Sequence, residues 1–497
     1  MKKLTILFAF AALLTACNSG LPKEFRQSEA LPNIYPDYTD VTVPINIAPL
    51  TFEIDGTPQE MAVRFTAGQQ EVICTGEKIQ PAADDWQTLV QSAAGKAIQV
   101  EVYALHHDTW TLYKPFSIYV SKDSIDPYIS YRLISPSYVA YDELTISQRC
   151  LENYDESVIY DNMLCGEEGK GQCINCHNYQ QYNPERIQFH ARETLGGTVI
   201  AYDGKIKKVN MRNDSILSAG VYPTWHPWLK MIVYSTNKTS QTFHAVDRNK
   251  VEVFDTESDL IAYDIENNEV WNIENDPNEL EVFPFWAPDG KTLYYCSAHF
   301  EYNDSTDKGQ QLLSRPTDVK YNVYKKSFNP ETKVFGPREL VFDAVAMEKS
   351  ATFPRISPDG RFLVFTLSDF GVFPIWHHEA DLWKIDLKTN EASPMAALNS
   401  EDTESYHSWS SNGKWIIFSS RRYDGQYTRP FIAHIDQNGN GTKPFELPCA
   451  DPDYHRQSIK CYNIPEFMRG PVTISPKAFA DVLKGEPEPV KYSPPTR

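Results

Sequence analysis

The amino-acid sequence predicts an all-β protein in which most of the chain forms a six-bladed β-propeller. Three observations lead to this fold class. Aromatic residues make up 13% of the 497 residues. Clusters of Gly, Pro, Asn and Asp interrupt the chain roughly every ten residues, with short apolar runs between them, as in strands joined by turns. A turn signature also recurs four times between residues 222 and 413, which is typical of a repeat architecture.

The N-terminus has the pattern of an exported lipoprotein. Lys2 and Lys3 precede an apolar run over 4–14, which is too short to span a bilayer. Leu14-Thr15-Ala16-Cys17 resembles the lipobox of bacterial lipoproteins, in which the peptide is cut before the cysteine and the cysteine carries the lipid. This resemblance implies a signal peptide over 1–16, a linker over 17–37 and a membrane anchor at Cys17. We therefore expect the protein in the bacterial cell envelope, at the outer membrane, on its periplasmic face or at the cell surface.

The next segment, 38–124, contains alternating strands over 41–45, 61–65, 97–103 and 110–120 but lacks the repeated turn. We expect a small immunoglobulin-like β-sandwich here. At the other end, residues 476–497 are rich in Pro, Lys and Glu, which indicates a flexible tail.

The repeated turn organises the segment 125–475. Its four copies begin at Tyr222-Pro223, Phe283-Pro284, Phe353-Pro354 and Tyr406-His407. Apolar runs follow them over 231–235, 292–296, 362–366 and 415–419. Asp-Gly or Asn-Gly between two apolar runs predicts a hairpin, so we interpret Asp289 and Asp359 as turn formers.

A repeating four-stranded unit of this kind is a propeller blade. The Pro-x-Trp-Ser-Pro-Asp-Gly pattern resembles the propeller of TolB and its relatives with WD40-like repeats, which are typically six-bladed. Further blades are expected over 187–211 and over 128–161, the latter closed by a C-terminal strand near 472–474. The resemblance implies a surface that binds a peptide or a cell-envelope protein.

The motif with the clearest chemistry is Cys173-Ile174-Asn175-Cys176-His177. Cys-x-x-Cys-His is the attachment signature of c-type haem, because two thiols reach the vinyl groups on one haem edge and the adjacent His gives Nε2 to iron. A redox dithiol or a zinc site are the alternatives, but neither a thioredoxin-like pattern nor a second ligand pair accompanies the motif. We predict one covalent haem c in a loop over 161–186, inserted between blades and sheltered by the propeller or the N-terminal domain.

The sequence does not fix which residue is the second axial ligand of the iron. His190 is the first candidate, and His226, Met211 and Met163 follow. Arg192 is a candidate partner for a haem propionate, because its planar guanidinium suits a carboxylate. We interpret His377 and His378 as part of a solvated loop.

The remaining cysteines allow disulfides in an exported chain. Cys449 could pair with Cys461, and Cys150 with Cys165, but the connectivity is not fixed by the sequence.

Three functions remain after composition is considered. The formal charge of −19 disfavours nucleic-acid binding, and the chain has no Gly-x-Ser-x-Gly, His-Glu-x-x-His or phosphate-loop motif, which disfavours hydrolysis. The first function is a lipid-anchored monohaem cytochrome that exchanges electrons with an envelope redox partner. The second is a TolB-like binding propeller whose haem is structural or sensory. The third is a haem peroxidase-type enzyme.

Overall fold

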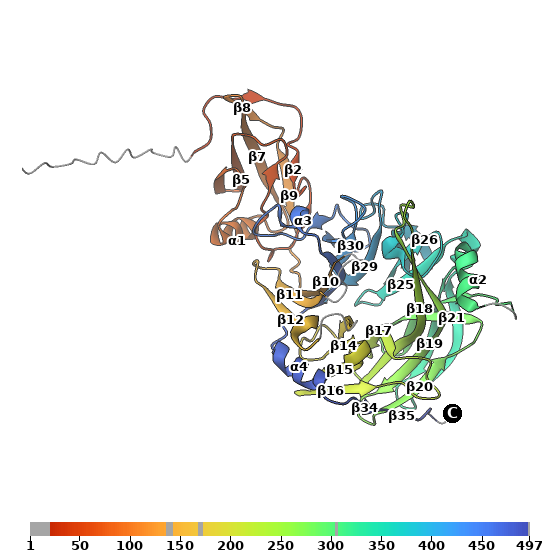
Figure 1. The fold of residues 1–497 in the computed structure, drawn as a ribbon. Coiled ribbons are helices and arrows are strands. Elements are labelled where there is room, and N and C mark those ends of the chain that lie inside the picture. Colours follow the sequence, from red (N-terminus) through yellow and green to blue (C-terminus); the bar gives the residue numbers. More distant parts are fainter. Residues whose placement is uncertain (1–19, 136–142, 167–171, 304–306, 496–497) are drawn as a thin grey trace, which may run out of the picture.

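The computed structural model describes residues 20–135, 143–166, 172–303 and 307–495. The predicted signal peptide and the lipid-bearing Cys17 fall outside these residues. Within them, no helix is both long enough and apolar enough to cross a membrane. An N-terminal module stands at one end of a larger body of strands (Figure 1).

The N-terminal module is built on one seven-stranded sheet. Its strands are β1 (Arg26–Gln27), β3 (Thr42–Val43), β5 (Glu60–Ala67), β6 (Gln70–Gly76), β7 (Ala97–His106), β8 (Thr109–Leu112) and β9 (Phe116–Val120). Beside it lie a two-stranded sheet of β2 (Ile34–Tyr35) and β4 (Glu53–Ile54) and the helix α1 (Ala83–Ser92).

The predicted immunoglobulin-like sandwich is therefore wrong. Trp86, Leu89 and Val90 have helical spacing and are buried on the inner side of α1. The helix contacts β5 and β6, where Trp86 meets Phe65 edge to face with ring centroids 6.1 Å apart. The core thus forms between one large sheet and a helix instead of between two large sheets.

The rest of the chain has a propeller-like arrangement of four-stranded antiparallel units. The first two sheets comprise β10 (Tyr128–Ile134), β11 (Thr145–Cys150), β12 (Glu156–Asp161) and β33 (Cys461–Met468), and then β13 (Ile174–Tyr179), β14 (Ile187–Ala191), β15 (Gly197–Tyr202), β16 (Lys205–Asn210) and β34 (Glu488–Pro489). The last two comprise β25 (Ser350–Ile356), β26 (Phe362–Ser368), β27 (Asp381–Asp386) and β28 (Glu391–Pro394), and then β29 (Glu404–Trp409), β30 (Trp415–Ser420), β31 (Arg429–His434) and β32 (Phe445–Glu446).

The remaining strands join in one nine-stranded sheet. They are β17 (Gly220–Trp225), β18 (Met231–Phe243), β19 (Val251–Asp264), β20 (Glu269–Glu274), β21 (Glu279–Trp286), β22 (Thr292–His299), β23 (Asn322–Asn329), β24 (Val334–Phe342) and β35 (Lys491–Tyr492). The predicted count of six separate blades is wrong: the described residues form four separate blade sheets. A parallel pairing of Ser258 with Leu280 connects β19 to β21, and it joins two repeats of the sequence in the nine-stranded sheet.

The repeated hairpins themselves are confirmed. Gly290, Gly360 and Gly413 have φ values of 56°, 75° and 67°, as expected at these turns. Asp289 and Asp359 accept hydrogen bonds from backbone N–H groups two residues later, at 2.8 and 3.0 Å. Both aspartates therefore act as turn formers.

The C-terminal end differs from the prediction in two ways. The strand that closes the first sheet is β33, which pairs with β10, and it lies before the expected 472–474. The flexible tail expected over 476–497 instead begins with the helix α4 (Pro476–Lys484), capped by Ser475, and continues as β34 and β35. Phe479, Ala480 and Leu483 are buried, because the apolar residues of this segment have helical spacing.

Short helices occupy the connections. They are α2 (Lys308–Ser314) and α3 (Tyr454–Gln457), with 3-10 turns at Asn162–Leu164, Glu193–Leu195, Pro316–Asp318, Val345–Met347 and Pro374–Trp376.

Candidate functional site in the central cavity

The Cys-x-x-Cys-His motif does not lie in an inserted loop. Its last four residues belong to β13, which pairs antiparallel with β14 from Ile174 opposite Ala191 to Tyr179 opposite Ile187. The pairing register shifts between Asn175 and Asn178. The motif is therefore part of a sheet, with a bulge at Cys176.

The bulge recurs around the molecule. Neighbouring first strands contact one another in a closed ring, in the order β13, β17, β21, β25, β29, β33 and back to β13. One residue of each has a positive φ: Cys176 (58°), Tyr222 (48°), Phe283 (53°), Phe353 (53°), Tyr406 (52°) and Ile464 (53°). The residue that follows is proline, except at His177 and His407. Cys176 and His177 thus occupy positions that the repeat itself defines.

Aromatic side chains from these positions fill the axis. The ring centroids of Tyr222 and Phe283 are 4.5 Å apart, those of Phe283 and Phe353 are 3.9 Å apart, and those of Phe353 and Tyr406 are 4.9 Å apart. We call this stack the aromatic plug. It separates a large cavity at one end of the axis from smaller spaces beyond it.

The large cavity has a volume of about 400 Å³ and is bordered by both thiols of the motif. Burial raises the pKa of the Cys176 thiol. Three arginines, Arg132, Arg192 and Arg421, border the same space among apolar and aromatic side chains. The cavity therefore combines two cysteines with a positively charged wall.

Arg421 is a buried cation in the wall of this cavity. It is 4% exposed, its guanidinium carbon lies 3.7 Å from the ring centroid of Trp376, and burial lowers its pKa. Its NH1 donates to the carbonyl of Gly425 at 3.4 Å, while its Nε has no hydrogen-bond partner. The Nε of Arg132 is also buried without a partner. Unsatisfied cationic donors in a cavity favour a carboxylate as ligand.

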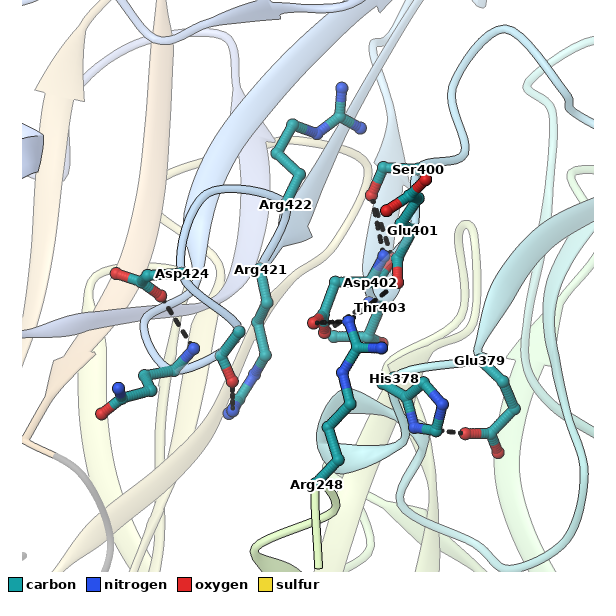
Figure 2. Close-up of polar contacts among 12 residues, drawn as sticks. Arg248, His378, Glu379, Ser400, Glu401, Asp402, Thr403, Arg421, Arg422 and Asp424 are labelled. Carbon is teal, nitrogen blue, oxygen red and sulfur yellow. Dashed lines mark hydrogen bonds and ion pairs between the residues drawn. The ribbon is translucent and has the colours of Figure 1, made fainter.

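The rim of the cavity includes the long hairpin of β18 and β19. Thr239, Gln241, Val251 and Val253 from this hairpin border the cavity. Figure 2 shows Arg248, near the tip of the hairpin, beside Asp402, and it shows Arg421 on a neighbouring loop. The NH2 atom of Arg248 is 2.9 Å from Oδ2 of Asp402. This ion pair ties the hairpin to the connection between the last two sheets.

His177 lies next to this cavity, on the other side of the plug. It borders a space of about 20 Å³, and that space shares Cys176, Tyr222 and Ile464 with the large cavity. Neither ring nitrogen of His177 makes a hydrogen bond of regular geometry. Burial and the charge of Arg132 lower its pKa to about 3, against the opposing effect of the backbone of Ser130 and Ile464. The imidazole is therefore neutral and both its nitrogens are unsatisfied.

The two cysteines and the arginines fit a c-type haem in their chemistry, because Cys173 and Cys176 border one cavity and three arginines of its wall can pair with propionates. His177 borders only the adjoining space, so the structure does not place its imidazole in the cavity that the cysteines line. In the described part of the chain, no group of three or more His, Cys, Asp or Glu side chains is arranged to hold a metal ion.

The structure does not bring the proposed second axial ligands into this cavity. His190 is buried on β14, where its Nδ1 is 3.1 Å from Thr198 Oγ1, and it borders a different cavity together with Met211. His226 Nε2 is 2.9 Å from the carbonyl of Gly290, which gives this His a structural role. Arg192 borders both cavities.

Two further expectations about side chains need correction. His377 is not in a solvated loop: it is buried between Glu252 and Glu379, with ring nitrogens 2.8 and 3.3 Å from their carboxylates, which raise its pKa to about 9 against the effect of burial. Among the described residues all eight cysteines are free, so neither disulfide that the sequence left open is formed.

Sequence reasoning missed Arg421, Trp376 and Arg132 as parts of the site. They belong to three different sheets or connections, and nothing in their local patterns distinguishes them from other surface residues. Cys176 has the same positive φ as the equivalent residues of the other repeats, and this repeat position brings it to the cavity that these three residues border.

Comparisons with known proteins complete the description. No family model and no curated protein match the sequence. Among solved structures, prolyl oligopeptidase B from Galerina marginata bound to a 25mer macrocyclization substrate is 11% identical, with a TM-score of 0.35 over 62% of this chain and 41% of that one. A puromycin-hydrolyzing peptidase of Mycobacterium tuberculosis is 11% identical (TM-score 0.34, 85% of this chain and 57% of that one).

A DUF4784 family protein from Bacteroides caccae is 8% identical (TM-score 0.28, 73% of this chain and 95% of that one). The chain spans less than two thirds of the length of the first two structures. Similarity at this level says nothing about activity.

Proposed function

We propose that this chain is an exported, lipid-anchored c-type cytochrome that holds one haem in the central cavity and exchanges electrons with a partner in the cell envelope. The observation that carries the proposal is the opening of both motif thiols, Cys173 and Cys176, into a single cavity of about 400 Å³. Haem would be held by thioethers at these cysteines and its carboxylates by the arginines, and His177 would ligate the iron once its imidazole turned from the adjoining space into the cavity.

When bound, the haem supplies a one-electron redox centre. The protein's own residues do the rest. Tyr222, Tyr406 and Trp376 exclude water from the cavity wall, and the arginines supply positive charge that stabilises a bound anion. The envelope location rests on the lipobox at Cys17, and lipid on that residue would hold the propeller at a membrane.

The test uses the repeat as its own control. The full chain is expressed with its leader in a host with haem-attachment machinery, and covalent haem is stained on a denaturing gel. We expect stain in the wild type and none in C173A/C176A. His177→Pro installs the residue that other repeats have at this position, so the strand is kept while the axial imidazole is removed. We expect its Soret band to be shifted from that of the wild type.

His407→Pro is the matched variant, because His407 has the same repeat position, is equally buried, and has a pKa lowered to about 3 by burial. It should keep the wild-type spectrum. A wild-type protein without covalent haem would overturn the proposal. A high-spin ferric spectrum that changes on adding peroxide would instead favour a haem enzyme over an electron carrier.

A second candidate function is a TolB-like binding propeller whose ligand is an organic carboxylate. Arg421, stacked on Trp376 with an unsatisfied Nε, favours it. Calorimetry with benzoate and with a short peptide bearing a free C-terminal carboxylate would test it in the haem-free C173A/C176A variant. Binding that is lost in Arg421→Met, and absent for the amidated peptide, supports this function. No heat with either probe would contradict it.

A further inference from the structure

A second cluster of reactive side chains lies away from the central cavity, beneath the N-terminal module. Glu446 ends β32, Cys449 follows three residues later, and His455 lies in α3. His455 Nδ1 is 2.6 Å from Glu446 Oε1, and its Nε2 is 3.5 Å from Cys449 Sγ. The exposed fractions are 1%, 5% and 1% for Glu446, Cys449 and His455. The imidazole thus lies between the carboxylate and the thiol, with its shorter contact to the carboxylate at Nδ1 and its shorter contact to sulfur at Nε2.

A second cation faces the same sulfur atom. Arg149, from β11 of the first sheet, places NH1 3.3 Å from Cys449 Sγ and donates through NH2 to the carbonyl of Pro448. Burial opposes ionisation of the thiol, but His455 and Arg149 outweigh it and lower the pKa of Cys449. In the other direction, Cys449 and Glu446 raise the pKa of His455 to about 9 against the effect of burial. Thiolate and imidazolium therefore stabilise each other.

The remaining charged and phenolic groups around the pair fix its geometry. Tyr423 donates to Glu446 Oε2 at 2.9 Å, and Tyr38 of the N-terminal module donates to the carbonyl of Glu446 at 3.4 Å. The hydroxyl of Thr51 donates to the carbonyl of Cys449. The segment that carries the thiol is thereby clamped between the module and two propeller sheets, at the junction where α3 lies in Figure 1.

We propose that Cys449 is a peroxide-reactive thiol, activated by His455 and Arg149 and oriented through Glu446. The thiolate is the nucleophilic form of cysteine, and an exposed fraction of 5% admits only a small reagent such as hydrogen peroxide. The site shares no residue with the haem motif, so the proposal is independent of the proposed cytochrome function.

The step is an oxidation of sulfur. The thiolate of Cys449 attacks one oxygen of hydrogen peroxide, a sulfur–oxygen bond forms and the oxygen–oxygen bond breaks. Sulfur is oxidised to sulfenic acid, and the leaving hydroxide takes the proton of the His455 imidazolium and departs as water. The neutral sulfenic acid no longer pairs with Arg149, which is left as an uncompensated buried charge. Oxidation would therefore weaken the junction between the N-terminal module and the propeller.

The test compares two cysteines within the same molecule. The full-length protein is treated with hydrogen peroxide, the peroxide is removed with catalase, and the protein is then unfolded in urea with dimedone, which traps sulfenic acid. Each cysteine is followed by peptide mass spectrometry. Cys296 is the internal control, because it is fully buried and burial alone raises its pKa well above the usual range. We expect Cys449 to be labelled about ten times faster than Cys296. Equal labelling would overturn the proposal.

Variants then assign the activation. Arg149→Met should slow the labelling of Cys449, while Arg149→Lys, which keeps a cation, should retain most of it. His455→Gln should also slow it, and a melting curve shows whether each variant is folded. If a variant does not fold, the wild-type comparison of Cys449 with Cys296 decides alone. Repeating that comparison in C173A/C176A excludes oxidants generated at haem, and the preference for Cys449 should persist there.

Discussion

Glu281, in β21, is a carboxyl group buried among other acids. It is 1% exposed, and its Oε2 has no hydrogen-bond partner. Burial, with the nearby Asp259, Glu274 and Glu279, raises its pKa to about 9. Since the same group titrates near its ordinary value in the unfolded chain, the folded protein holds a proton here that the unfolded chain has released at neutral pH.

This difference gives a prediction for stability. The contribution of Glu281 is fully present below about pH 4 and is lost as pH rises toward 9, at roughly 1.4 kcal/mol per pH unit within that window. Glu281→Gln has no such proton, so urea unfolding at pH 5 to 8 should show a shallower loss of stability than in the wild type. Glu339→Gln, at an exposed position, should follow the wild type. A parallel loss in Glu281→Gln would contradict the assignment.

At the scale of elements, the C-terminal helix contributes more to the free energy of unfolding than its polar composition indicates. Phe479 of α4 is fully buried, with ring centroids 5.3 Å from Phe189 and 6.5 Å from Tyr160. Phe479→Ala should lower the free energy of unfolding by about 3–5 kcal/mol in urea titrations, because it leaves a cavity between α4 and two sheets. Lys477→Ala, on the exposed side of the helix, should change it by less than about 0.5 kcal/mol.

The elements also show which parts of the fold were predictable. The hairpins around Gly290, Gly360 and Gly413 were, because a turn signature is local and its physics is confined to a few residues. The blade count was not, since the pairing of Ser258 with Leu280 that merges two repeats leaves no mark in either segment. Helix α1 was missed because no element was assigned between the predicted strands 61–65 and 97–103, where Trp86 and Leu89 have helical spacing.

The candidate sites divide in the same way. The motif thiols were recognisable, because five adjacent residues carry their chemistry. The strand that contains them was mistaken for a loop, since Cys176 and His177 replace the aromatic residue and proline found at these positions in three of the other repeats. Arg149 and Cys449 lie 300 residues apart, so no spacing could have indicated their contact.

On the scale of the whole molecule, the N-terminal module and the propeller share one apolar core. Leu89 and Val100 of the module belong to the same buried cluster as Trp415 and Ile417 of β30. Ion pairs reinforce the junction, with Arg456 NH2 2.9 Å from Asp55 Oδ1. Two regions joined in this way should unfold together.

That expectation can be measured by hydrogen exchange with mass spectrometry. Leu89→Ala should destabilise the module by about 2–5 kcal/mol, and amide exchange should accelerate in β30 as well as in β7. Leu31→Ala, at an exposed position, should alter neither strand. Faster exchange in β7 with unchanged exchange in β30 would show that the two regions open independently.

The aromatic plug has a consequence for binding at the two ends of the propeller axis. Tyr222, Phe283 and Phe353 lie on the axis between the arginine-lined cavity and the far end, where Trp225, Trp286 and Trp409 border another space. The two spaces share no lining residue. A ligand in the arginine-lined cavity and a partner protein at the tryptophan end would therefore not compete for the same side chains.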